Sequence, residues 1–170
     1  MSAALSGLLG AGASPSPSFI RTAGAPSSRP RRLDTVGYDS AGKQHAIVAM
    51  SFSEAFDDVY HYGISQPVRA AGLICERMDH VAFTGDIVAE MKRRIAEATL
   101  MIADLTDANP NVYLEVGYAW GVGTPCILTC HSDTTPTFDV RSQRCLYYTS
   151  IKKLEYILAA ELAELPSLAQ

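Results

Sequence analysis

The fold of this chain is decided by one stretch near its middle, residues 100–129, which reads LMIADLTDANPNVYLEVGYAWGVGTPCILT. The stretch opens with an apolar run of strand length and continues into a polar loop. From Val112 to Val122 the apolar residues predict a helix, which Gly123 should end. A second apolar run follows at 125–129. A strand, a helix and a strand in this order predict two parallel strands joined by a crossover helix.

The same alternation extends in both directions from this unit. Apolar runs predict three more strands, at 46–50, 73–75 and 146–148. Three more helices should start in turn after Ser53, at Gly85-Asp86 and after Ser150, with Ser53 and Ser150 as their caps. In the first of these helices Pro67 should interrupt the turns, and Gly72 should follow the last turn. The buried stripe of the second helix should consist of Ile87, Val88, Met91, Ile95 and Ala98.

Five strands that alternate with helices predict an α/β fold, a flavodoxin-like or Rossmann-like three-layer sandwich around one parallel sheet. The commonest strand order for this winding is 2-1-3-4-5. In that order the chain direction reverses between the first and third strands, and ligands bind beyond the carboxyl ends of those strands. The sequence therefore predicts a ligand site formed by Met50 to Ser53 and by Asp104 to Glu115.

The first 36 residues differ from the rest in composition. Of these residues, 21 are Ser, Ala, Gly or Pro, and four Arg accompany one acidic residue, Asp34. Such a segment buries too little apolar surface to fold, so we expect a disordered tail over residues 1–40 and an α/β domain over 41–166. The composition is also that of an organelle transit peptide. The expected location is therefore the cytoplasm, or an organelle if the tail is a targeting signal.

Charge and composition narrow the classes of partner. The 170 residues carry a net charge of −4, and residues 37–170 alone carry −7, from 10 basic and 17 acidic side chains. An acidic domain does not favour nucleic acid as a partner. No apolar run approaches the roughly 20 residues that a membrane helix needs. Four Cys do not make a disulfide framework in a chain of this length, and they indicate a reducing compartment.

Glu115 is the most informative residue of the predicted ligand site. It falls near the amino end of a helix that begins at about Asn111, where the helix dipole favours an ionised carboxylate. A carboxylate held at a ligand crevice can attack the anomeric carbon of a sugar. It can equally be a helix residue that only stabilises the dipole, with Asn111 as the cap. The residues alone leave both interpretations open.

The chain resembles the nucleoside 2-deoxyribosyltransferase and nucleotide N-glycosidase superfamily, which also includes TIR-like nucleotide-binding domains. The shared motifs are ADLT at 103–106, NPNV at 109–112, YLEVGYA at 113–119 and GTP at 123–125. The segments AIVAMSF at 46–52 and FTGDI at 83–87 are similar to the family's first strand and to the start of its second helix. The resemblance covers roughly residues 45–160.

The resemblance implies an enzyme that cleaves or transfers at the N-glycosidic bond of a nucleoside or nucleotide. It implies that Glu115 is the nucleophile and forms a glycosyl-enzyme intermediate. The family's acid, which helps to protonate the leaving base, falls near Met91 in this chain, so Asp86, Glu90 and Asp104 are the candidates for that role. The resemblance implies neither a metal nor an organic cofactor, and it makes a homo-oligomer plausible.

Seven residues around the predicted crevice are expected to bind the substrate: Met50, Ser51, Phe52, Ser53, Asp86, Asn109 and Asn111. The hydroxyls of Ser51 and Ser53 stand before a helix start, where free amides suit a phosphate or a ribose. Capping and turn formation alone would also explain Ser53, Asn109 and Asn111.

Two other functions stay open. A TIR-like domain could hydrolyse NAD or a related nucleotide, and a non-catalytic nucleotide sensor could use the same crevice. Cys126, Cys130 and His131 suggest a zinc site, but their spacing lacks a second pair of ligands, so we expect no metal.

Overall fold

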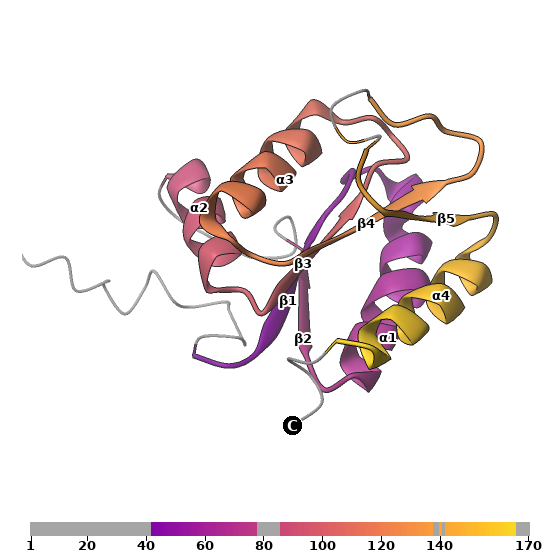
Figure 1. Ribbon diagram of the computed structural model, residues 1–170, viewed down its shortest axis with the longest axis horizontal. Helices are drawn as coiled ribbons and strands as arrows, with labels where there is room; N and C mark the ends of the chain where they lie inside the picture. The colour runs from indigo at the N-terminus through magenta and orange to yellow at the C-terminus, as the bar shows by residue number, and fades with distance from the viewer. Residues whose placement is uncertain (1–41, 78–85, 138–139, 141, 166–170) are drawn as a thin grey trace, which may run out of the picture.

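The computed structural model describes residues 42–77, 86–137, 140 and 142–165. These residues form one sheet of parallel strands with helices on both of its faces (Figure 1). The strand order is β2-β1-β3-β4-β5, which confirms the predicted α/β fold and its winding. The strands are β1 (His45–Ala49), β2 (Ile74–Arg77), β3 (Leu100–Asp104), β4 (Cys126–His131) and β5 (Cys145–Tyr148). The predicted tail, residues 1–40, lies outside the described residues.

The strand register brings the two predicted site segments together. β1 lies between β2 and β3, and Ala49 pairs with Ala103 where these two strands end. β3 pairs with β4 up to Asp104 and Thr129. Because all strands are parallel, their carboxyl ends lie at one edge of the sheet, which we call the carboxyl edge. The chain therefore leaves β1 and β3 side by side at this edge.

The connection from β1 to β2 differs from the single helix that the spacing predicted. It consists of a 3-10 turn, η1 (Glu54–Phe56), a π-helix, η2 (Val59–Ser65), and a short α-helix, α1 (Gln66–Ala70). Pro67 stands where the π-helix gives way to α1, so its predicted interruption is confirmed. Proline has no amide hydrogen and its ring clashes with the carbonyl four residues earlier, which a wider turn relieves. Gly72 follows α1 with φ of 86°, as predicted.

The other helices begin and end close to their predicted positions. They are α2 (Ile87–Glu97), α3 (Pro110–Val122) and α4 (Ile151–Ala163). Asp86 caps α2 by accepting hydrogen bonds from the amides of Val88 and Ala89 at 3.0 and 3.1 Å. Ser150 caps α4, and Gly123 follows α3 with φ of 81°. Within the described ranges no helix has both the length and the apolar character needed to cross a membrane.

Each face of the sheet has its own apolar core (Figure 1). On one face η2, α1 and α4 pack through residues such as Ile64, Val68 and Leu158. On the other face α2 and α3 pack through residues such as Ile95 and Val116. Each helical layer therefore covers one face of the sheet, and the two layers have only the edges of the sheet in common.

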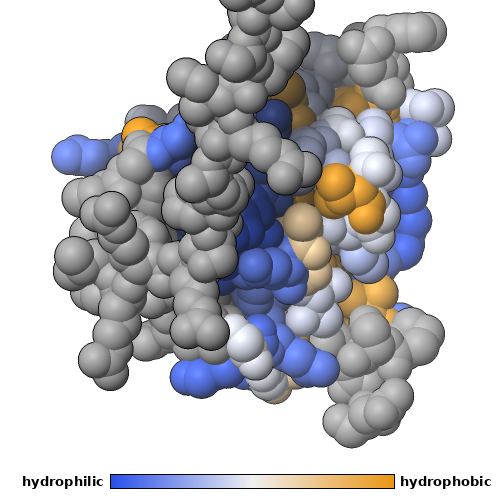
Figure 2. Space-filling model, turned by 90° about the vertical axis from the view of Figure 1, so that its left-hand side faces the viewer, coloured by the Kyte–Doolittle hydropathy of each residue, from blue (hydrophilic) through white to orange (hydrophobic). Residues whose placement is uncertain are grey.

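The predicted buried stripe of α2 is wrong in its first turn. Met91 and Ile95 are buried, but Ile87 and Val88 are 68% and 51% exposed. Both residues lie at the carboxyl edge, where α2 begins and the sheet beneath it ends. Figure 2 shows the side of the molecule on which α2 lies, where apolar residues stand at the surface beside strongly hydrophilic ones.

Gly63 provides a test of the close contact between η2 and α4. A Cβ at Gly63 would lie 2.8 Å from Cδ2 of Leu154, which is fully buried. We expect Gly63→Ala to lower the free energy of unfolding by about 1–3 kcal/mol, because a packed side chain must move. Gly117→Ala on α3, where no atom lies within 4 Å of the added carbon, should instead be neutral or stabilising. Urea unfolding of both variants measures this, and equal effects would contradict the predicted contact.

Candidate active site

The segment after β1 supplies four of the predicted site residues. Met50 and Ser51 are buried, whereas Phe52 and Ser53 are exposed, with Phe52 at 55%. Ser53 precedes η1, as predicted, but its hydroxyl makes no capping hydrogen bond. The ring of Phe52 and the hydroxyl of Ser53 are therefore accessible to a ligand at the carboxyl edge.

The carboxylate of Asp104, at the end of β3, is the centre of a buried hydrogen-bond network. Asp104 is only 3% exposed. The backbone amide of Thr106 donates to its Oδ1 at 3.1 Å. The hydroxyls of Thr129 and Tyr148 donate to its Oδ2 at 2.8 and 3.0 Å. These donors come from the end of β3, from β4 and from β5. The side chain of Asp104 therefore connects the carboxyl ends of three strands through hydrogen bonds.

Thr106 extends this network to the residues after β4. Its hydroxyl accepts a hydrogen bond from the amide of His131 at 2.9 Å and lies 3.1 Å from the hydroxyl of Tyr148. Because the Tyr148 hydroxyl donates to Asp104, it accepts from Thr106. The carbonyl of Thr106 also accepts from the hydroxyl of Thr134 at 3.1 Å. In this network Asp104 accepts three hydrogen bonds. Its role as the acid that protonates the leaving base stays a prediction.

Sequence reasoning did not find the partners of Asp104. Thr129 and Tyr148 lie 25 and 44 residues further along the chain. Each occupies an ordinary position in an apolar strand, so no local spacing marks it as polar and functional. Only the order of the strands in the sheet brings their hydroxyls to one carboxylate.

The start of α3 corrects the prediction for its cap. Asn109 is the cap, and its side chain accepts a hydrogen bond from the amide of Asn111 at 3.0 Å. The expectation that Asn111 caps the helix is therefore wrong. Pro110 follows as the first helical residue, where proline is favoured because an amide hydrogen would have no helical partner. The side chain of Asn111 is exposed and accessible to a ligand.

Glu115 lies in the second turn of α3 and is partly buried. Burial raises the pKa of its carboxyl to about 7, and no described residue donates a hydrogen bond to it. Burial therefore opposes the ionised form, which the position near the amino end of the helix was expected to favour. The helix dipole acts mainly on the first turn, and Glu115 lies beyond it.

Glu90 lies on the side of α2 that faces away from α3. The guanidinium of Arg93 donates to Glu90 at 2.9 Å, in an ion pair within α2. Arg94, one turn after Glu90, pairs with Glu76 on β2. Lys92 lies about 200° around the helix from Glu90 and reaches toward α3, with Nζ 5.7 Å from the ring centre of Tyr118. The structure thus does not bring Glu90 toward Glu115, whereas Asp86 stands at the carboxyl edge as the cap of α2.

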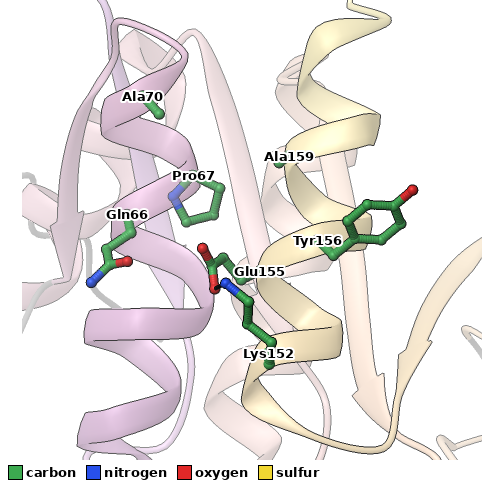
Figure 3. A pocket seen from close by; sticks show the side chains of 7 residues that line it. All are labelled: Gln66, Pro67, Ala70, Lys152, Glu155, Tyr156 and Ala159. Atoms are coloured by element: carbon green, nitrogen blue, oxygen red, sulfur yellow. Dashed lines mark hydrogen bonds and ion pairs between the residues drawn. The ribbon is translucent and has the colours of Figure 1, made fainter.

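A hollow lies in the other helical layer and is separate from the predicted site. It is an open groove of about 390 Å³ between α1 and α4 (Figure 3). Lys152 and Glu155, both on α4, form an ion pair at 2.8 Å in its lining. Among the described residues, no three His, Cys, Asp or Glu side chains gather in a way that could hold a metal ion.

The comparisons with known proteins agree with this fold. No protein-family model matches the chain, and no curated protein matches it in sequence. Among solved structures it is similar to the CMP N-glycosidase BcmB of Clostridium botulinum, with a TM-score of 0.56 and 16% identity. The match covers 69% of this chain and 99% of that chain. The two proteins share their fold. At this level of identity the likeness shows the fold alone.

The raised pKa of Glu115 predicts that this residue makes stability depend on pH. Its carboxyl has a pKa of about 7 in the folded state and about 4.5 in the unfolded state, so the folded state binds more protons between these values. Stability should therefore fall as pH rises from 4.5 to 7, by up to about 3 kcal/mol from this group. Glu115→Gln should be increasingly stabilised relative to the wild type as pH rises from 5 to 8. Denaturant unfolding at these two pH values measures the difference, and a constant difference would contradict the prediction.

The network around Asp104 predicts that the Tyr148 hydroxyl contributes to stability. Tyr148→Phe removes one of three donors to a buried carboxylate and leaves the Thr106 hydroxyl without its acceptor. We expect a loss of about 1–3 kcal/mol in the free energy of unfolding. Tyr156→Phe, on the exposed surface of α4, is the matched control and should change it little. Similar urea midpoints for the two variants would show that the network does not stabilise the fold.

Proposed function

We propose that this protein cleaves or transfers at the N-glycosidic bond of a nucleoside or nucleotide, with Glu115 as the nucleophile. The observation that carries the proposal is the partly buried carboxyl of Glu115 at the carboxyl edge. It stands in a fold shared with a CMP N-glycosidase, at the position where the sequence motif implies the nucleophile. These observations support a nucleotide N-glycosidase in general and do not select a particular base or sugar.

In the proposed reaction a carboxylate oxygen of Glu115 attacks C1′ of the sugar. The C1′–O bond forms as the bond from C1′ to the base nitrogen breaks, and the base leaves with that electron pair. A proton from an acid or from water neutralises the departing base. Water then attacks C1′ of the ester and releases the free sugar, or a second base attacks and gives a new nucleoside. Only the ionised form of Glu115 can begin this sequence.

The partial burial of Glu115 suits this chemistry. A carboxylate outside bulk water is a better nucleophile, and it stabilises the positive charge that develops at C1′ more strongly. The carboxyl group is uncharged in part of the molecules at neutral pH, so the rate should depend on its ionisation.

We assign the remaining predicted residues to binding. Phe52 offers an exposed ring on which a base can stack, and Ser51 and Ser53 lie where a phosphate or sugar hydroxyl can meet hydroxyls and free amides. Asn109 and Asn111 stand at the start of α3, one to two turns before Glu115, and suit the sugar hydroxyls. Of the three candidate acids, Asp86 has the exposed carboxyl at the carboxyl edge, so we propose it as the group that assists the leaving base.

The experiment is to incubate the protein with nucleosides, nucleoside 5′-monophosphates and NAD, and to measure free base by chromatography. We expect release of base from at least one nucleoside or monophosphate. Glu115→Gln should lower the rate by at least about 100-fold and keep substrate binding, because it removes the nucleophile and preserves the shape of the side chain.

Several outcomes would change the proposal. Release of nicotinamide from NAD alone would replace it with the TIR-like hydrolase. Binding of nucleotides without release of base from any of them would favour a sensor. Addition of a second base to the assay separates transfer from hydrolysis, and light scattering measures whether the protein is the expected homo-oligomer.

A further inference from the structure

Two large apolar residues at the start of α2 are exposed. Ile87 and Val88 are 68% and 51% exposed, although the sequence pattern predicted both to be buried. The carboxylate of Asp86 holds this first turn in place through the amides of Val88 and Ala89. Both apolar side chains therefore project from a helix turn that the Asp86 cap holds in place.

The contacts between α2 and α3 fix the register of the two helices. Near their carboxyl ends the hydroxyl of Thr124 donates to the carbonyl of Ile95 at 2.9 Å. One turn earlier on α2, Nζ of Lys92 lies 5.7 Å from the ring centre of Tyr118. The two helices therefore run in the same direction, side by side, and both begin at the carboxyl edge.

Extending this register by one more turn points Val88 toward the side of α3 that carries Glu115. Val88 lies four residues before Lys92 and shares its side of α2, and Glu115 lies three residues before Tyr118 and shares its side of α3. The apolar neighbour agrees with the burial that raises the pKa of the Glu115 carboxyl. Ile87 lies four residues before Met91, on the same side of α2, and so continues the inner stripe of the helix beyond the sheet.

We infer that Ile87 and Val88 form an apolar wall of the active site, against which the leaving base of a nucleotide lies while Glu115 faces its sugar. The inference rests on the proposed function and names the part of the substrate that this surface contacts. A planar base has apolar faces and the sugar phosphate has none, so an apolar wall discriminates between these two halves of the substrate. Each apolar carbon buried against a ligand contributes about fourfold to tenfold in affinity or specificity.

The test compares a nucleotide with the same sugar phosphate without its base. The double variant Ile87→Thr/Val88→Thr keeps both β-branched side chains and makes the wall polar, and Val122→Thr is the control. Val122 is 44% exposed at the other end of α3, away from the carboxyl edge. Each change is made in the Glu115→Gln background to prevent turnover. Calorimetry then measures the dissociation constants of cytidine, uridine, adenosine and guanosine 5′-monophosphates and of ribose 5-phosphate.

We expect the double variant to bind its best nucleotide at least about tenfold more weakly and to bind ribose 5-phosphate unchanged. Val122→Thr should change neither constant. An equal loss of affinity for both ligands, or no loss for either, would overturn the inference that Ile87 and Val88 contact the base. If the wild type releases no base but still binds nucleotides, the proposed function fails. The comparison of nucleotide with ribose 5-phosphate binding then still tests whether Ile87 and Val88 contact the base. If neither ligand binds to the parent protein, both proposals fail.

Discussion

The arrangement of the carboxyl edge depends on the buried carboxylate of Asp104. It accepts hydrogen bonds from the Thr106 amide and from the hydroxyls of Thr129 and Tyr148, so it ties together the ends of β3, β4 and β5. A buried charge without such donors would cost several kcal/mol, so these partners have to be in place when the sheet folds. The loop that leads from β3 to α3 starts at this anchored point, and α3 carries Glu115. Asp104 thus positions the candidate nucleophile indirectly.

Two carboxyl groups of the same edge have opposite environments. Asp104 receives three hydrogen bonds, whereas Glu115 receives none from the described residues, and burial raises the pKa of its carboxyl to about 7. The first arrangement stabilises the fold. The second costs stability whenever the group is ionised, which is typical of groups retained for chemistry rather than for packing. This contrast supports the assignment of Glu115, and not Asp104, as the reactive carboxylate.

The order and type of the elements could be predicted because apolar runs and helical spacing are local properties of the chain. The errors occurred where a neighbour in space decides the outcome. The spacing predicted one helix after the first strand, whereas the structure has a 3-10 turn, a π-helix and a short α-helix there. Ile87 and Val88 fit the stripe of α2 and are exposed, because the spacing does not say where the sheet beneath the helix ends. The spacing also does not say which side of α2 faces α3, and Lys92, not the candidate acid Glu90, lies on that side.

The sequence by itself determined the α/β class and the identity of Glu115 as the residue to examine, since these follow from periodicity and from one motif of adjacent residues. It predicted the strand order only as the commonest winding of five such strands. The tertiary structure alone decided the partners of Asp104, the protonation of Glu115 and the surface formed by Ile87 and Val88. These three features depend on hydrogen bonds between strands, on the exclusion of water and on where the sheet ends. Each of these is set by residues that are distant in the chain. Their effects appear only when folding brings those residues together.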